Sequence, residues 1–318
     1  MKNLIKKIIN FIAQNRNHKI NHEILFQIGS SHFINVRKKY SEVKHLNELD
    51  FKVFSQSGED GIIDYLLYSL DIKIPKFVEI GIGDYQEANT RFLFERTNAK
   101  GLVIDCLNQL HEKVSKNLTL WKGDLKIIEK FVNAENINHV LKENQFNNQI
   151  DLLSLDVDGI DYWILNSLPS NLSKIVVVEY NATFGGDLEI TVPNISTFNR
   201  TNYHYSNLCF GASLKAIIKL MKNKDYVFLG TNLSKINAFF VSKNELSKIN
   251  LNLPSENDLS EHVNSNIRES RTADGKLSYL SGNDKIKEIE NCEVIDLSKK
   301  NLTSIKIKEL LSKDQNSK

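Results

Sequence analysis

A run of apolar residues that ends in two closely spaced glycines constrains the fold of this chain more than any other feature. Residues 77–84 read FVEIGIGD, so a strand-like segment leads directly into a turn that contains Gly81 and Gly83. Glycine has no Cβ atom and readily adopts positive φ, which lets the backbone turn tightly and approach a ligand. A second run, residues 101–105, follows a helix-like segment and ends in Asp105. Doubly wound sheets use an acid at that position to bind ribose hydroxyls, so the two runs predict a nucleoside site.

The charges around the two glycines distinguish between two kinds of nucleoside. A pyrophosphate-binding turn has a third glycine where this chain has Gln86. Glu79 and Asp84 also put negative charge where phosphates would lie. S-adenosylmethionine carries a sulfonium and an amino group but no phosphate, so these carboxylates favour it over NAD. A tight strand-to-helix turn in some other α/β protein is the alternative interpretation.

The central part of the chain alternates between strand-like and helix-like segments, as in a doubly wound α/β fold. Apolar runs predict parallel strands at residues 76–81, 101–106, about 126–133, 151–156 and 174–180. Helical periodicity separates these runs at residues 86–96, 107–121, 136–145 and 160–168. A helix at 214–222 and strands at 226–229 and 238–241 follow. We therefore predict a Rossmann-like sheet of seven strands, mostly parallel. The final short-loop pair resembles the layout of class I methyltransferases, which implies an antiparallel last strand; dinucleotide-binding dehydrogenases normally lack that closing pair.

A second group of acids follows the fourth predicted strand, in residues 150–161 (IDLLSLDVDGID). Ligands of open α/β sheets lie beyond the carboxyl ends of the strands, so Asp156 and Asp158 should face the same crevice as the glycine turn. The spacing resembles a calcium loop, but an EF-hand needs a closing Glu where this chain has Ser167. Capping of the next helix by Asp158 or Asp161 is the alternative role.

The fifth predicted strand brings further polar side chains to the same edge of the sheet. Glu179 and Asn181 stand at its end and should lie beside the end of the fourth strand. Together with Asp156 they offer the oxygen ligands that Mg²⁺ prefers, which predicts a metal site of Asp156, Glu179 and Asn181. Direct hydrogen bonds from Glu179 and Asn181 to substrate hydroxyls are the alternative.

Three motifs carry a family resemblance: residues 55–62 (SQSGEDGI), residues 79–84 with Asn89 and Thr90 after them, and residues 151–159. Over roughly residues 50–245 the chain resembles the FkbM-like S-adenosylmethionine-dependent methyltransferases, which have the class I methyltransferase fold. More narrowly, the chain resembles a poorly characterised bacterial branch of that group, and the residues that carry this resemblance are 179–181, 193, 204–206, 211–214 and 237–240. Where many relatives have Glu or Asn, this chain has Val157, Asp158 and Ile160, which leaves the role of the extra aspartate open.

The resemblance implies an O-methyltransferase that acts on a hydroxyl of a sugar-containing or other polar small molecule or glycan, as in polysaccharide biosynthesis. It implies that the cofactor is held by Glu79, Gly81, Gly83, Asp84, Asn89, Asp105, Glu135 and Asp156. An alcohol that accepts a methyl group must lose its proton, and the candidate bases are Asp156, Asp158 and His204. A surface position is the alternative for His204. Gln56, Glu59 and Asp60 could fold over the cofactor, or Asp60 could cap the helix near Gly61.

Composition narrows the class of protein only a little. The 41 basic and 39 acidic residues are well mixed and leave a formal charge of +2, so no bulk field predicts a nucleic-acid partner. Cys106, Cys209 and Cys292 lack the spacing of a zinc knuckle or a disulfide framework, which favours a reducing cytoplasm. No run approaches about 18 consecutive apolar residues, so we expect no transmembrane helix.

Extensions are expected on both sides of the methyltransferase domain, which we place at residues 51–245. Within the helical extension 1–50, residues 1–13 form a basic amphipathic segment that packs on the protein or on a dimer partner, or lies on an anionic membrane surface. In the extension 246–318, Arg268 and Arg271 either clamp an anionic substrate group or pair with surface acids. The polar tail from Ser312 onward should be disordered.

Three classes of function remain open at this stage. The first is the S-adenosylmethionine-dependent O-methyltransferase. The second is an NAD-linked oxidoreductase, which Gln86 and the acids around the glycine turn disfavour. The third is a non-catalytic cofactor-binding or assembly subunit, because a fold does not guarantee chemistry.

Overall fold

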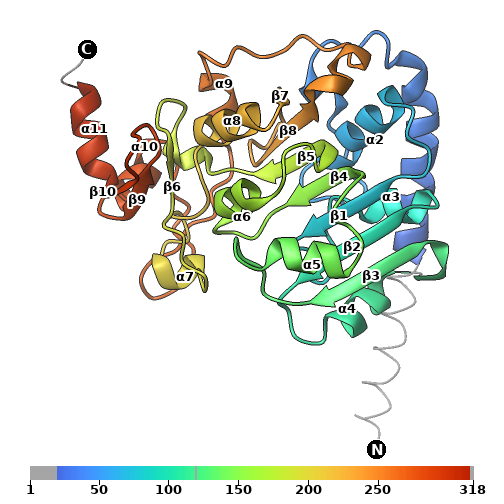
Figure 1. Ribbon diagram of the computed structural model, residues 1–318, viewed down its shortest axis with the longest axis horizontal. Helices are drawn as coiled ribbons and strands as arrows, with labels where there is room; N and C mark the ends of the chain where they lie inside the picture. Colours follow the sequence, from blue (N-terminus) through green and yellow to red (C-terminus); the bar gives the residue numbers. More distant parts are fainter. Residues whose placement is uncertain (1–19, 119, 316–318) are drawn as a thin grey trace, which may run out of the picture.

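A seven-stranded sheet forms the centre of the computed structural model, which describes residues 20–118 and 120–315 (Figure 1). Its strands are β1 (Lys76–Ile80), β2 (Lys100–Asp105), β3 (Asp124–Glu129), β4 (Ile150–Leu155), β5 (Ser173–Glu179), β7 (Tyr226–Thr231) and β8 (Asn237–Ser242). They lie in the order β3-β2-β1-β4-β5-β8-β7. Strands β1 to β5 pair in parallel, and β8 enters antiparallel between β5 and β7. The predicted Rossmann-like sheet with its closing pair is confirmed.

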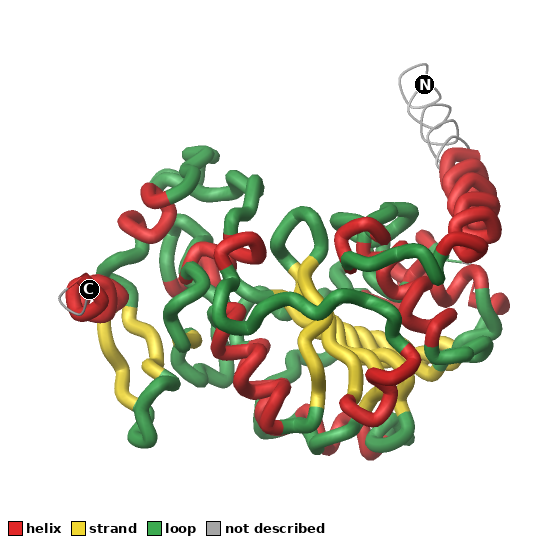
Figure 2. The backbone as a smooth tube through the Cα atoms, turned by 90° about the horizontal axis from the view of Figure 1, so that it is seen from above, coloured by secondary structure: helices red, strands yellow, loops and turns green. Residues whose placement is uncertain are grey.

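Helices cover both faces of this sheet and enclose a core on each side (Figure 2). One core packs β1, β4 and β5 against α5 (Ile137–Glu143), α6 (Asp161–Ser167) and α8 (Leu214–Asn223). The other core packs the opposite faces of the strands against α2 (Glu59–Ser69), α3 (Arg91–Arg96) and α4 (Leu110–Asn117). Successive strand residues point to opposite faces, so a strand buried on both faces has a continuous apolar run, as β5 has at residues 175–178.

Several boundaries differ from the prediction: α4, for example, is shorter than the helix expected at residues 107–121. Two of the differences have a clear physical reason. The helix expected at residues 86–96 begins only at Arg91, because the buried Glu79 carboxylate accepts the backbone N–H groups of Asn89 and Thr90 and holds that stretch as a loop. Strand β3 lies at residues 124–129 instead of about 126–133, because its register with β2 pairs Asp124 with Lys100.

A second, three-stranded sheet connects the C-terminal segment to the middle of the chain. Its order is β10 (Thr303–Lys306), β9 (Glu293–Asp296) and β6 (Ile190–Thr191), so strands from both sides of residue 245 share one sheet. The remaining α-helices are α7 (Arg200–Tyr203), α9 (Ser260–Val263), α10 (Asn283–Glu288) and α11 (Ile307–Gln315), besides one at residues 20–36. The 3₁₀ helices are η1 (Arg37–Lys39), η2 (Leu46–Leu49), η3 (Leu120–Lys122), η4 (Ala182–Phe184) and η5 (Lys243–Lys248). The second sheet lies on the side toward which the arrowheads of β1 and β3 point (Figure 1).

Several expectations about the two extensions need correction or lie outside the described residues. Ser312 is part of α11, so the expected disorder is wrong for residues 312–315. Around Asp274 and Gly275 the chain turns back on itself, and one antiparallel bridge joins Arg271 to Leu277. The amphipathic segment 1–13 lies outside the described part of the chain. No helix within the described part has the length and apolar character that crossing a membrane requires.

Candidate active site

Three cavities open at the carboxyl ends of the central strands. We name each after one lining residue. The Asp84 cavity has about 690 Å³ and includes Gly81, Gly83 and Asn89 in its lining. The Asp105 cavity has about 460 Å³ and shares Gly81 and Gly83 with it. The Glu179 cavity has about 200 Å³ and lies beyond β5. Among the residues that line these three cavities, only Asp156 belongs to all of them.

The glycine turn brings the end of β1 against the end of β4. Gly81 has φ of 85°, and a Cβ atom there would stand 1.4 Å from the carbonyl oxygen of Asp156. The Gly81 N–H donates to the carbonyl oxygen of Ile104 at 2.9 Å, which ties the turn to β2 as well. Gly83 has φ of 55° but open space around its Cβ position, so only its conformation favours glycine.

Glu79 holds this turn together from beneath. Its buried carboxylate accepts the Asn89 N–H at 2.8 Å and the Thr90 N–H at 2.9 Å, and it also accepts the Thr90 hydroxyl. Burial raises the pKa of Glu79 to about 7. The Asn89 side chain in turn donates to the Ser154 hydroxyl of β4 at 3.0 Å. Both residues line the Asp84 cavity as predicted, and their hydrogen bonds shape its wall.

Asp105 connects the ends of β1 and β2. One carboxylate oxygen accepts the Gly83 N–H at 2.8 Å, and the other accepts the Leu107 N–H at 2.9 Å. The carboxylate therefore stands at the mouth of the Asp105 cavity, whose apolar walls include Ile104 and Ile160. Asp84 lies across the turn, faces the Asp84 cavity and accepts the Gln86 N–H at 3.0 Å. The structure thus brings together the glycines and the two acids that the sequence predicts.

Asp156 and Glu179 form a carboxyl pair at the ends of β4 and β5, with candidate ligand oxygens within 4.8 Å of each other. Burial raises the pKa of both groups well above the usual range. Repulsion from Asp158 and Asp161 adds to the effect at Asp156, and repulsion from Asp156 adds to it at Glu179. Two carboxylates this close cannot both stay ionised at low cost, so the geometry favours one proton shared by the pair. Glu179 Oε2 is buried and has no hydrogen-bond partner among the described residues.

Asp158 faces the same cavity from a left-handed backbone conformation, with φ of 53°. The guanidinium of Arg200, at the start of α7, forms an ion pair with it. Arg200 also lies 3.4 Å from Glu269 and 5.3 Å from the ring centroid of Phe210. Sequence reasoning missed Arg200, because nothing in its local pattern indicates that α7 folds back over the end of β4.

Asp161 has a structural role, but not the helix capping that the sequence left as an alternative, because α6 has no side-chain cap. Its buried carboxylate accepts the Val157 N–H at 2.8 Å and the Gly159 N–H at 3.0 Å, which fixes the turn between β4 and α6. Burial raises the pKa of Asp161 to about 6. The side chain therefore supports Asp156 and Asp158 from behind.

Asn181 does not offer its side chain to a metal. Its amide oxygen accepts the Thr183 N–H at 3.0 Å, and its amide nitrogen donates to the carbonyl oxygens of Leu208 and Phe210. These bonds anchor the loop after β5 to the loop before α8. The carboxylates that the structure brings together are Asp156, Asp158 and Glu179, whose candidate ligand atoms lie within 4.8 Å of one another. The predicted ligand set is therefore corrected by exchanging Asn181 for Asp158.

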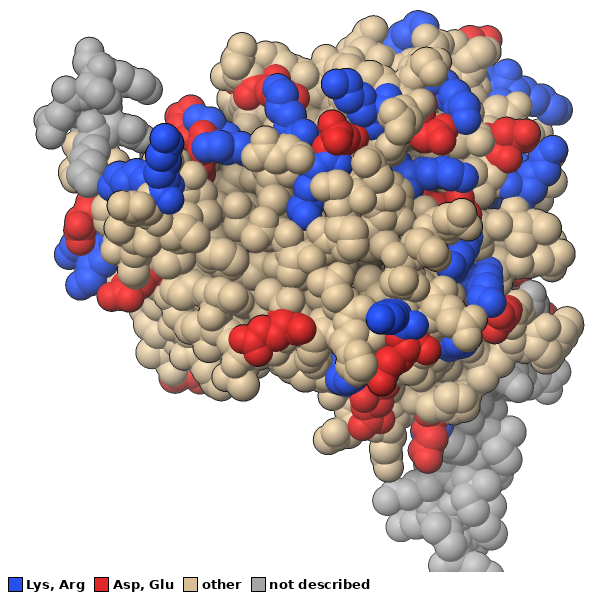
Figure 3. All heavy atoms as spheres, viewed as in Figure 1, with Lys and Arg blue, Asp and Glu red and all other residues tan. Residues whose placement is uncertain are grey.

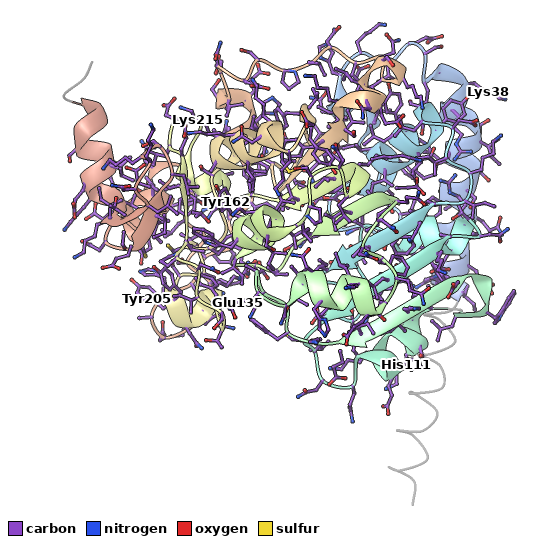
Figure 4. All side chains as sticks on the ribbon, viewed as in Figure 1. Lys38, His111, Glu135, Tyr162, Tyr205 and Lys215 are labelled. Atoms are coloured by element: carbon purple, nitrogen blue, oxygen red, sulfur yellow. The ribbon has the colours of Figure 1, made fainter. Side chains whose placement is uncertain are left out.

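Other predicted residues lie outside the three cavities. His204 binds Ser206 at 2.7 Å and stacks on Tyr205, which Figure 4 shows beside α7. Glu135 is exposed in the loop before α5 (Figure 4). None of the three cavities has either residue in its lining, so the geometry does not support the expected base and cofactor roles.

The segment before β1 contains two buried acids with structural hydrogen bonds and one residue that lines two of the cavities. Asp60 accepts the N–H groups of Val53, Phe54 and Ser55, and Glu59 accepts the side-chain amides of Asn232 and Asn237. Both acids are buried, and their hydrogen bonds hold the protein's own backbone and side chains. Gln56 is the residue of this segment that lines both the Asp84 and the Glu179 cavities.

The two arginines of the C-terminal segment line none of the three cavities, and Arg271 pairs with Glu269 at 3.5 Å, which is the alternative that the sequence offered. Arg268 donates to the carbonyl oxygen of Tyr279, and Arg271 to that of Gly275. Neither lines the Glu179 cavity, so a clamp made of these arginines is not supported.

The surface shows no large patch of one charge on the face that Figure 3 shows, where basic and acidic side chains are mixed.

Comparisons with known proteins agree with this geometry. The sequence profile of the methyltransferase FkbM domain matches residues 67–228, just over half of the chain. Comparison with curated proteins yields no match.

Similar solved structures include the N-terminal domain of EvdMO1 with SAH bound, at 11% identity and a TM-score of 0.36, covering 55% of this chain and 75% of that one. An O-methyltransferase family protein from Burkholderia thailandensis has 10% identity, a TM-score of 0.36 and coverage of 58% of each chain. PKMT2 from Rickettsia typhi, in complex with AdoHcy, has 11% identity and a TM-score of 0.35, covering 57% of this chain and 53% of that one. These are remote similarities, and the family match agrees with the resemblance read from the motifs. The chain belongs to the FkbM family of S-adenosylmethionine-dependent methyltransferases.

Proposed function

We propose that this protein transfers the methyl group of S-adenosylmethionine to a hydroxyl of a polar small molecule or glycan. One observation carries the proposal: Asp156 lines the two cavities beside the glycine turn and also the Glu179 cavity. A methyl donor in the first two cavities and an acceptor in the third would therefore meet at this carboxyl group.

The two cavities beside the turn suit the two ends of the donor. The Asp105 cavity combines a carboxylate for ribose hydroxyls with apolar walls for an adenine ring. The Asp84 cavity offers carboxylates next to exposed backbone, which suits the amino group and the sulfonium. The antiparallel β8 and the missing third glycine set the NAD interpretation aside.

The carboxyl pair supplies the base that an alcohol needs. In the transfer, the bond from sulfur to the methyl carbon breaks, the acceptor oxygen bonds to that carbon, and the hydroxyl proton moves to Asp156. The products are a methyl ether and S-adenosylhomocysteine. Burial raises the pKa of Asp156, which makes its carboxylate a better proton acceptor, and Glu179 keeps the shared proton in the resting pair. Alignment of donor and acceptor supplies the rest of the rate.

A divalent cation is a second possible occupant of the same cluster. Carboxylate oxygens of Asp156, Asp158 and Glu179 lie within 4.8 Å of one another, and the orphaned Glu179 Oε2 would gain a partner. Two oxygens on one Mg²⁺ stand at most about 4.2 Å apart, so the cluster would have to contract slightly. A bound Mg²⁺ would stabilise the acceptor as an alkoxide. Asp156 and Glu179 would hold it, joined by Asp158 once that side chain leaves Arg200.

Calorimetric titration with S-adenosylmethionine, S-adenosylhomocysteine and NAD tests the proposal, with Asp105→Ala as the control variant. We expect both adenosyl ligands to bind and the variant to bind them at least about tenfold more weakly, since it loses two positioned hydrogen bonds. Methyl transfer to hydroxylated acceptors is then measured with Mg²⁺ and with EDTA. Binding of NAD alone, or of none of the three ligands, would overturn the proposed function.

A further inference from the structure

The C-terminal segment forms one wall of the Glu179 cavity. Ser265, Ile267, Glu269 and Lys285 line it opposite the carboxyl pair. Lys285 belongs to α10, which lies next to the second sheet in Figure 1. The cavity is therefore completed by residues outside the part of the chain that the family profile matches.

Lys285 is a buried cation without a counter-charge in the described part of the chain. Only 8% of the residue is exposed. Its ammonium donates to the carbonyl oxygen of Ile267, and no described carboxylate lies within ion-pair distance. Burial and the nearby Arg268 lower the pKa of Lys285. A buried ammonium usually has an ionic partner, because losing hydration is costly.

The other charges around this cavity do not neutralise Lys285. Arg200 pairs with Asp158 and with Glu269, so those two acids already have a cation. Lys235, on the loop between β7 and β8, lines the cavity as well and makes no ion pair with a described residue. The cavity thus has an acidic end at Asp156 and Glu179 and unneutralised cations elsewhere in its lining.

A neutral polar group completes the lining between these charges. Asn207 is 8% exposed, and its amide oxygen is buried without a hydrogen-bond partner among the described residues. Asp158, Asn207 and Lys235 all have positive φ, a conformation that costs non-glycine residues energy and is enriched at binding sites. An orphaned acceptor of this kind suits a ligand hydroxyl.

We propose that the acceptor is a small hydroxylated acid, whose anionic group, a carboxylate or a phosphate, is bound by Lys285 with Lys235 beside it in the lining. The hydroxyl to be methylated lies at Asp156, and a further hydroxyl donates to Asn207. The volume of about 200 Å³ limits the part that enters to about one sugar-sized ring. This assignment rests on the proposed function, since it identifies the acceptor of the same site.

Ligand-observed NMR on the full chain, saturated with S-adenosylhomocysteine, tests this assignment. The probes are glucuronate and galacturonate for a carboxylate, glucose 6-phosphate for a phosphate, and glucose and galactose as neutral controls. We expect at least one acid to bind about tenfold more tightly than its neutral counterpart. The arm that binds identifies which anion the site takes.

Variants connect that binding to Lys285. Lys285→Met should weaken the acid about tenfold, and Lys285→Arg should retain much of the affinity. Lys287→Met is the matched control, because Lys287 is an exposed residue of the same helix and the charge change is equal. Lys235→Met is the second test if Lys285→Met does not fold.

Three results would overturn the assignment. The first is that neutral sugars bind as well as the acids, and the second is that no acid binds. The third is unchanged acid binding in Lys285→Met, or in Lys235→Met if Lys285→Met does not fold. The affinity for S-adenosylhomocysteine, measured in parallel, separates this from the proposed function. Loss of acid binding with intact nucleoside binding supports the assignment. A wild-type chain that binds acids through Lys285 but no S-adenosylhomocysteine would refute the methyltransferase proposal alone.

Discussion

Gly81 lies directly against Asp156, so that any side chain at position 81 would collide with the carbonyl oxygen of Asp156 at 1.4 Å. This contact aligns the glycine turn of β1 with the carboxyl end of β4. It explains why the two cavities that Gly81 lines both include Asp156.

Gly81→Ala should therefore destabilise the protein and abolish binding of the nucleoside. The left-handed conformation alone costs an alanine about 1–2 kcal/mol, and the collision with Asp156 adds to it. Gly83→Ala is the control, because it has the same type of conformation but open space. Denaturant unfolding and titration with S-adenosylhomocysteine measure both effects. Equal losses for the two variants would show that the contact with Asp156 is unimportant.

Asp156→Asn should lower the rate of methyl transfer by about 10²- to 10⁴-fold, the range of a lost general base. Binding of S-adenosylmethionine should change far less, because Gly81 and Asp105 remain in place. Single-turnover transfer and titration with the donor separate the two quantities. If the variant transfers methyl groups at the wild-type rate, Asp156 is not the general base.

Glu179→Gln distinguishes a shared proton from a metal in the carboxyl pair. A glutamine amide can donate to Asp156 as a protonated Glu179 does, so the rate should stay within about tenfold of wild type. If Mg²⁺ occupies the cluster, the variant loses a ligand instead, and its activity should collapse together with any response to EDTA. Transfer assays with and without Mg²⁺ give the answer.

The same variant should change how stability depends on pH. Burial holds the pKa of Glu179 above its unfolded value. The folded state therefore binds the proton more tightly, and this contribution to stability is present below the unfolded pKa and is lost as the pH rises. Glu179→Gln has no such proton, so its free energy of unfolding should rise relative to wild type as the pH increases above the unfolded pKa of a glutamate, about 4. Urea unfolding at several pH values checks the sign.

Asp158→Asn should shift the acidic limb of the pH–rate profile to lower pH. The negative charge of Asp158 raises the pKa of Asp156, so its removal lowers that pKa and keeps Asp156 ionised in more acidic solution. The matched control is Glu261→Gln, since Glu261 is exposed on α9 and lines none of the three cavities. A limb that stays in place in Asp158→Asn would contradict the repulsion that we describe.

The parts of the site that follow regular strands could be predicted from the sequence. Gly81 and Asp105 come directly after apolar strands, and the carboxyl ends of parallel strands meet at one edge of a sheet. The side chains that follow irregular loops could not. Asn181 has a plausible ligand type, yet its amide is used by the loop carbonyls of Leu208 and Phe210.

The sequence by itself determined the succession of strands and helices along the chain and the position of the glycine turn, because apolar periodicity and the need for a missing Cβ are local properties of the chain. Only the tertiary structure decided that Arg200 and Lys285 reach the Glu179 cavity and that His204 does not. These three residues stand on segments joined by long loops, whose paths depend on contacts between parts far apart in the chain. Such contacts leave no periodic pattern in the sequence, so the acceptor side of the site became visible only in the folded molecule.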